Sequence, residues 1–376
     1  MKYFFSRGYS GTKIIEDFVI QVEGDRIADV SFNECHDCID FGDSILTPSF
    51  VDIHTHGIMG IDSFTATYDD FKIWEKLLLK HGVQFFVPTI VSAPIPVIEN
   101  FLKNVKYSIP RGSILGGRLE GPLISMNKKG AHNPKNLIPP REFPVEDLVS
   151  NYGDALKIID IAPELDGAIE MIESFHDKII FSIGHTDCKT EKCVEGFKAG
   201  SRHVTHLFNA MRPFHHRDPG LVGEALVLDD VNVEVITDLV HLAPETIKLI
   251  FKCKRLENIV MITDSISATS MGDGEYKLGE LDVEVRNGVA KIKGTDTIAG
   301  STLTLDKALK NMISIGFKPE DFLSALTVNP SRIMGIKHGL IDVNYYGRMN
   351  VFDSQFNLKG IIRDDRYREV EGIDGD

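Results

Sequence analysis

The 376-residue sequence predicts an α/β protein built on a (β/α)8 TIM barrel, to which a small β-sandwich domain is added. Three observations lead to this prediction. Short apolar runs alternate about eight times with longer amphipathic segments in the middle of the chain. Both ends are instead rich in short strands and turns, and neither end is large enough to hold a core of its own. Residues of the kinds that bind metal ions follow several of the apolar runs.

The two ends of the chain are predicted to form one β-sandwich domain from residues 1–47 and 339–376. Near the N-terminus, residues 18–22 and 27–30 flank a turn that contains glycine, which is typical of a hairpin. Near the C-terminus, residues 347–353 begin a similar pair of strands. A single domain shared by both ends is the simplest interpretation, because each half needs the other to bury its apolar face.

The barrel is predicted to occupy residues 48–338. Its strand candidates are short apolar runs at 49–54, 83–89, 114–120, 156–162, 179–185, 203–206, 231–237 and 259–264. Its helix candidates are amphipathic segments at 68–80, 96–105, 167–175, 189–199, 244–253 and 304–315. Two segments interrupt the alternation. Residues 207–228 are predicted to be a long loop or an interrupted helix, and residues 272–299 an inserted hairpin around Asn287-Gly288.

Two histidines close the first strand candidate, in the stretch TPSFVDIHTHG at 47–57. Side chains two residues apart on a strand project to the same side, so His54 and His56 can grip one metal ion. They could also be two polar residues that end an ordinary strand. The other strands must decide between these interpretations.

Further polar residues end other strand candidates: Glu120 the third, His185 the fifth, His206 the sixth and Asp264 the eighth. In a barrel all these positions share the C-terminal rim, where the chemistry of the fold is found. Because several independent strands finish in His, Glu or Asp, we interpret the rim as a divalent metal site. Imidazole and carboxylate ligands suit zinc or iron, with manganese as a further option, and their number leaves room for one ion or two.

A metal ion with an open position lowers the pKa of coordinated water to about 7 and provides a hydroxide nucleophile. Asp264 is the natural general base of such a reaction, because the first and eighth strands are neighbours in a closed barrel. It would accept the water proton and then pass one to the leaving group. The alternative role of Asp264 is a cap of the turn that follows.

The charge and composition of the chain limit the classes of molecule that it can bind. The formal net charge of -14 argues against nucleic acids and anionic membranes, which need a positive surface, but not against an anionic small molecule. The sequence has no long apolar run and no signal-peptide pattern. Its five cysteines are odd in number and scattered, which is typical of reduced thiols, so we expect a cytoplasmic protein.

These motifs resemble the N-acetylglucosamine-6-phosphate deacetylase family of the amidohydrolase superfamily, along nearly the whole chain. The matching stretches are PSFVD with HTH (48–56), LEGP (119–122), KGAH (129–132), APE (162–164), GHT (184–186), THLFNAM (205–211), RDPG (217–220), ITD with the following histidine (236–241), TD (263–264) and GSTL (300–303). The resemblance implies hydrolysis of N-acetylglucosamine 6-phosphate to glucosamine 6-phosphate and acetate. It also implies the barrel with its β-sandwich, and a homodimer.

The resemblance further implies ligands and a catalytic group. Glu120, His185 and His206 would bind one metal ion, and Asp264 would be the catalytic aspartate. Some relatives replace the first two histidines and hold a single ion. Since this sequence keeps both His54 and His56, it leaves room for a second ion.

The substrate contacts are also implied by the resemblance. His132 would help to polarise the acetyl carbonyl, and Asn209 and Ala210 would hold the phosphate through amide and backbone groups. Arg217 and His241 would meet the sugar or the phosphate, one of them across a dimer interface. Relatives commonly have a glycine after the aspartate of the ITD stretch, where this chain has a leucine, and the larger side chain could shift the histidine.

Other functions stay open. The substrate could be another N-acetylhexosamine 6-phosphate, such as the galactosamine epimer, because a few loop residues set that choice. An amidohydrolase acting on cyclic amides often uses a carbamylated lysine at the end of the fourth strand, where this chain has Ala162-Pro163-Glu164. A non-catalytic scaffold should show broken ligands, whereas all six rim residues are intact.

Overall fold

The structure is a computed structural model that describes residues 1–32 and 36–373. Its contacts divide the chain into two compact units. The first contains Met1–Asp52, Glu75–Phe85 and the segment from Thr304 onward, and the second contains Ile53–Trp74 and Phe86–Leu303. The domain boundaries expected at 47/48 and 338/339 stay a prediction.

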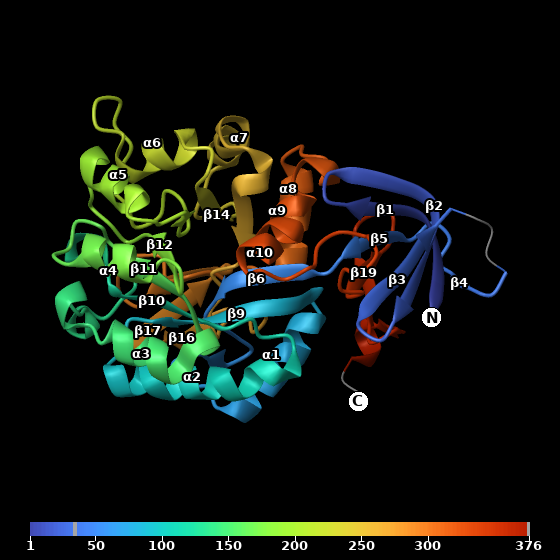
Figure 1. The fold of residues 1–376 in the computed structure, drawn as a ribbon, viewed down its shortest axis with the longest axis horizontal. Coiled ribbons are helices and arrows are strands. Elements are labelled where there is room, and N and C mark those ends of the chain that lie inside the picture. Colours follow the sequence, from blue (N-terminus) through green and yellow to red (C-terminus); the bar gives the residue numbers. More distant parts are fainter. Residues whose placement is uncertain (33–35, 374–376) are drawn as a thin grey trace. The chain divides into compact units, whose positions relative to one another are not determined.

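In the first unit, strands from both ends of the chain form one eight-stranded sheet (Figure 1). Its order is β21-β20-β19-β5-β1-β2-β3, and β4 pairs with β1. The bounds are β1 Lys2–Ser10, β2 Lys13–Glu23, β3 Arg26–Ser31, β4 Ile39–Asp40, β5 Ile45–Pro48, β19 Met349–Phe352, β20 Leu358–Arg363 and β21 Arg366–Glu369. Tyr3 and Phe5 alternate along β1 and pack with Phe18 in a fully buried cluster. The prediction that both termini share one β-domain is confirmed.

Eight strands form the barrel, in the order β6-β9-β10-β11-β12-β13-β14-β15. Their bounds are β6 Phe50–Thr55, β9 Val83–Val91, β10 Gly117–Leu123, β11 Leu156–Ile161, β12 Ile180–Ile183, β13 His203–Val204, β14 Asn232–Ile236 and β15 Ile259–Ile262. The ring closes where Thr55 pairs in parallel with Ser265 and the Asp264 N–H donates to the His54 carbonyl at 2.9 Å. The predicted barrel and its eight strand candidates are confirmed.

Helices follow most of the barrel strands along the chain (Figure 1). Their bounds are α1 Tyr68–Leu79, α2 Ile95–Ser108, α3 Val145–Tyr152, α4 Ala168–Phe175, α5 Thr190–Lys198, α6 Gly220–Val227, α7 Pro244–Cys253, α8 Leu305–Ser314, α9 Leu323–Leu326 and α10 Val328–Ile333. Every predicted helix is present. The sequence did not predict α3, because the prolines before it are typical of a loop, and it left α6 within a long irregular segment. Two glycines within α6, Gly220 and Gly223, weaken its helical signal.

The inserted segment is a three-stranded antiparallel sheet of β16 Gly274–Leu278, β17 Leu281–Arg286 and β18 Val289–Ile292. Its predicted hairpin turn is confirmed, since Asn287 and Gly288 both have positive φ, 51° and 74°, as a tight two-residue turn requires. A short hairpin of β7 Gly57–Ile58 and β8 Ile61–Asp62 follows the first barrel strand. Over the described residues, no helix combines the length and apolarity needed to cross a bilayer.

Candidate metal centre and active site

His54 lies in β6, a strand whose residues are all buried, and His56 directly follows the last residue of that strand. The Nε2 atoms of His54 and His56 lie 3.2 Å apart, so the two rings face the same space, as their spacing predicted. The Nδ1 atom of His56 lies 2.9 Å from the Thr89 carbonyl oxygen. Because a carbonyl oxygen only accepts, the His56 proton sits on Nδ1, and its Nε2 lone pair is left for an ion.

Glu120 lies within β10, which continues to Leu123, and its carboxylate lies between two groups of imidazoles. Its Oε1 lies 2.9 Å from His206 Nε2 and 3.1 Å from His185 Nε2, and its Oε2 lies 3.2 Å from His56 Nε2. Asp264 completes the first group, with Oδ1 at 3.1 Å from His56 Nε2.

The ligand atoms therefore form two donor sets. One is His54, His56, Glu120 and Asp264, and the other is Glu120, His185 and His206; within each set the ligand atoms lie within 4.8 Å of one another, and every member is buried. The six rim residues that the sequence singled out are brought together at one place.

Three of these residues have unusual backbone geometry. His185, His206 and Asp264 have φ angles of 46°, 26° and 53°, in the left-handed region where non-glycine residues are uncommon. Each such residue costs on the order of 1–3 kcal/mol, and residues of this kind cluster at functional sites. The backbone thus turns these three side chains away from their strand direction and toward Glu120.

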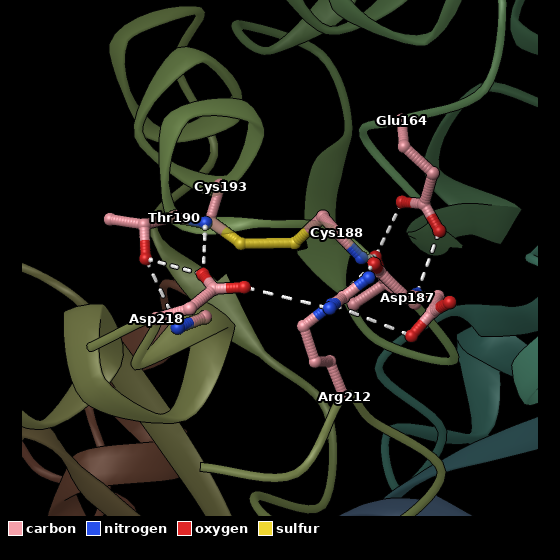
Figure 2. Close-up of a disulfide and its surroundings, with 9 residues drawn as sticks. Glu164, Asp187, Cys188, Thr190, Cys193, Arg212 and Asp218 are labelled. Carbon is pink, nitrogen blue, oxygen red and sulfur yellow. Dashed lines mark hydrogen bonds and ion pairs between the residues drawn. A yellow bond between two sulfur atoms is a disulfide. The ribbon is translucent and has the colours of Figure 1, made fainter. Parts of the chain in front are cut away.

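Hydrogen bonds to Glu164 and from Arg212 hold the loop that follows His185 (Figure 2). The Glu164 carboxylate accepts hydrogen bonds from the Thr186 hydroxyl and, at 2.7 Å, from the Asp187 N–H. The guanidinium of Arg212 donates to the Asp187 carbonyl at 2.9 Å. These contacts fix the backbone directly after His185.

A disulfide joins Cys188, in the same loop, to Cys193 in helix α5 (Figure 2). The expectation of reduced thiols is therefore wrong for this pair. Two cysteines separated by five positions gave no spacing signal, because the pairing depends on how the loop after β12 turns into α5. The cysteine content no longer supports a cytoplasmic location, which stays a prediction.

Beneath the rim lies a buried charge network that the sequence analysis missed. Arg118 is fully buried and bonds with both Asp160 oxygens at 3.1 Å, and also with Glu234 and with the Thr205 hydroxyl. A signal was available, because Arg118, Asp160 and Glu234 each lie inside an otherwise apolar, buried run of a predicted strand. Such residues are almost never fully buried unless they are paired.

The donor chemistry fits a divalent cation. Burial lowers the pKa of His54, and so does Arg118, but three surrounding carboxylates raise it overall to about 10. Burial likewise lowers the pKa of His56, and Glu120 and Asp264 raise it overall to about 9. In the absence of an ion the imidazoles therefore recruit protons to offset the carboxylates. A cation can supply the same positive charge.

A cavity of about 380 Å³ opens directly above the donor atoms, within the usual range for a small-molecule site. Its lining includes five rim residues and four of the predicted substrate contacts, His132, Asn209, Ala210 and His241. Asp296 and Thr297, from the inserted segment, also line it and were not predicted as site residues. Arg217 is exposed, contacts His216 at 2.9 Å and is not among the lining residues.

His132 faces the cavity as a neutral ring. Burial lowers its pKa to about 4, although Glu120 opposes this shift. The backbone N–H of Ser92 donates to His132 Nδ1 at 3.1 Å. The proton of the neutral ring must then lie on Nε2, which is 3.3 Å from Glu120 Oε2 and available to a substrate oxygen.

His241 lines the cavity, although Leu239 stands two positions before it, where relatives commonly have a glycine. Leu239 adopts a φ of 64°, which a glycine would favour. The Asp238 carboxylate holds this turn, because it accepts from the N–H groups of Val240 and His241 at 2.9 Å and lies 2.7 Å from His241 Nδ1. Burial lowers the pKa of His241, but Asp238 raises it overall, which favours a positive ring.

The barrel with buried imidazole and carboxylate donors at its C-terminal rim defines a metal-dependent hydrolase of the barrel type. The sequence pattern described as "Amidohydrolase family" matches residues 45–373. The chain belongs to the amidohydrolase family.

Similar proteins within that family indicate which of its members this chain resembles. N-acetylglucosamine-6-phosphate deacetylase of Bos taurus is 32% identical over 368 residues, which cover 93% of this chain and 88% of the relative. The Bacillus subtilis protein of the same name is 36% identical over 279 residues, covering 72% and 70%. A solved structure of a mutant N-acetyl-D-glucosamine-6-phosphate deacetylase from Mycobacterium smegmatis, in complex with N-acetyl-D-glucosamine-6-phosphate, has a TM-score of 0.92, 30% identity and 98% coverage of both chains. Within the amidohydrolases, the chain belongs with the N-acetylglucosamine-6-phosphate deacetylases.

Proposed function

We propose that the protein hydrolyses N-acetylglucosamine 6-phosphate to glucosamine 6-phosphate and acetate with the help of bound divalent metal. The observation that carries this proposal is the cavity whose base is formed by the two donor sets that share Glu120. The relatives named for this activity match the chain over most of its length, which supports the same substrate here.

Two ions are proposed, one in each donor set, with zinc or iron as the preferred metals. The buried carboxylates of Glu120, Asp160, Glu234 and Asp264 outnumber the Arg118 guanidinium, so the centre is negatively charged when its imidazoles are neutral. A divalent ion bound there would act as a Lewis acid and lower the pKa of a coordinated water.

Asp264 is proposed as the general base and then the general acid. Burial raises the pKa of its carboxyl group, but His54 and His56 lower it overall, so the group is ionised and ready to accept a proton. It takes the proton of the attacking water as the oxygen bonds to the acetyl carbon. It then gives that proton to the sugar nitrogen as the C–N bond breaks, which yields acetate and the free amine.

His132 is proposed to donate its Nε2 proton to the acetyl oxygen. A neutral donor suits this role, because it stabilises the negative charge that develops on that oxygen without first having to lose a proton.

The phosphate is proposed to bind at the far side of the cavity. Asn209 and Ala210 would offer amide and backbone N–H groups, and His241 a positive ring. Arg217 lies outside the cavity of its own chain, so its forked guanidinium would reach a phosphate from the partner in the homodimer that we also propose.

An acetate-release assay on zinc-loaded enzyme tests the function. We expect turnover of N-acetylglucosamine 6-phosphate, a far slower reaction with unphosphorylated N-acetylglucosamine, and a 10²–10⁴-fold lower kcat for Asp264→Asn. Equal rates on the two sugars would refute the phosphate assignment, and full activity of the variant would refute the role of Asp264. N-acetylgalactosamine 6-phosphate, assayed in parallel, decides between the two epimers.

A further inference from the structure

The Glu234 carboxylate, which extends from β14, lies directly beneath the metal centre. It is fully buried and accepts five hydrogen bonds. The donors are both terminal nitrogens of Arg118, His54 Nδ1 at 3.0 Å, His203 Nε2 at 2.9 Å and the backbone N–H of His206 at 3.2 Å. One side chain therefore touches a member of each donor set.

We propose that Glu234 is the positioning residue of the metal centre and sets which nitrogen of His54 faces the ion. This inference rests on the proposed metal-dependent function. An ionised carboxylate only accepts hydrogen bonds, and both oxygens of Glu234 are paired with the permanently charged Arg118 guanidinium. When His54 is neutral, as a ligand of an ion must be, its one proton therefore stays on Nδ1, and the Nε2 lone pair faces His56, Glu120 and Asp264.

Glu234 also supports the second donor set through the backbone. The His206 N–H donates to the Glu234 side chain, and the next N–H, of Leu207, donates to the Glu234 main-chain carbonyl at 2.8 Å. These two bonds clamp His206, whose φ of 26° a free loop would avoid. Substituting the side chain removes only the first of them, so we expect the His54 set to suffer more than the His206 set.

A comparison with Asp160 distinguishes a positioning role of Glu234 from a role in charge balance alone. Asp160 is as deeply buried as Glu234 and bonds with the same Arg118. Asp160 takes its hydrogen bonds from Arg118, whereas Glu234 bonds with Arg118 and also with His54 and the His206 N–H. If the network served charge balance alone, losing either carboxylate would have the same effect on metal binding.

The test compares Glu234→Gln with Asp160→Asn in full-length protein stripped of metal and titrated with Co²⁺. His54 and His203 bond with different oxygens of Glu234, and glutamine keeps only one acceptor oxygen, so the two histidines cannot both retain their acceptor. The negative charge that holds the His54 proton on Nδ1 is also lost, which favours moving that proton to Nε2 and blocking the ion. We expect one of the two cobalt dissociation constants to rise 10–100-fold in Glu234→Gln, with a loss of part of the visible Co²⁺ absorption. Asp160→Asn removes the same unit of charge but leaves the acceptors of His54 in place, so we expect a much smaller loss of cobalt affinity than in Glu234→Gln.

Similar cobalt affinities for the wild type and Glu234→Gln, or equal losses in both variants, would overturn the inference. Glu234→Asp keeps the charge beside Arg118 and so protects the fold if Glu234→Gln does not express. Aspartate is one methylene shorter than glutamate, so its oxygens lie farther from His54. We expect cobalt affinity to fall in this variant too, but less than in Glu234→Gln. Wild-type protein that binds cobalt but releases no acetate would refute the proposed substrate and leave this comparison intact.

Discussion

Replacing Arg118 with methionine should be among the most destabilising single changes in the barrel. The guanidinium is fully buried and bonds with Asp160, Glu234, the Thr205 hydroxyl and the Ile53 carbonyl. Methionine fills a similar length with apolar atoms but leaves two buried carboxylates without their cation. Breaking a buried ionic cluster in this way costs about 3–5 kcal/mol, because the remaining charges lose their compensation.

The expected loss can be measured as a thermal shift. In a domain of 150–250 residues, 1 kcal/mol corresponds to about 2–4 °C, so Arg118→Met should lower the Tm by roughly 6–20 °C in differential scanning calorimetry. Metal-loaded and metal-stripped protein should both show the shift, since Arg118 is in neither donor set.

Arg141→Met is the matched control. Arg141 also bonds with two carboxylates, Asp166 and Glu170, but its side chain is 56% exposed. Water solvates those carboxylates when the arginine is lost, so we expect little change in Tm. Equal Tm values for the two variants would show that burial does not give the Arg118 network its strength.

Three further results are expected. Arg217→Ala should raise the KM for the phosphorylated sugar far more than for a neutral one, and an unchanged KM in steady-state assays would remove Arg217 from the site. The raised pKa values of His54 and His56 mean that the metal-free folded state binds more protons than the unfolded state above about pH 6.5. Their stabilisation is full below that pH and is lost as the pH rises through about 9 to 10, so the Tm of stripped protein should fall over this window; a Tm that rises there would contradict the assignment. Cys193→Ser opens the short loop closed by Cys188, which should cost about 2 kcal/mol by loop-closure entropy, and urea unfolding of the wild type that is insensitive to reductant would argue against the bond.

Much of the barrel could be predicted, because its signals are local. The apolar run before His54 and the two-residue period of a strand suffice to place two imidazoles on one side. The Asn287-Gly288 turn was equally readable, since its positive φ angles suit those residue types. The rim residues followed from the rule that strand ends of a barrel meet at one face.

The missed features depend on contacts between distant strands. Glu234 touches His54 across 180 positions and Arg118 across 116, and no local pattern specifies such pairs. Helix α6 has glycines within it, and its order comes from packing rather than propensity. Arg217 was predicted as a contact of the sugar or phosphate only by resemblance; it is exposed, and its role stays a prediction.

The pairing of β5 with β19 has a consequence for synthesis on the ribosome. The two strands are separated by about 300 residues, so at roughly 5–20 residues per second the edge of β5 waits on the order of 15–60 s for its partner to be translated. During that interval the nascent chain exposes an unpaired strand edge, which is a template for wrong pairing with other chains. Slow elongation, or a chaperone that covers this edge, should therefore matter more for the yield of this protein than for one whose sheet is completed by neighbouring strands.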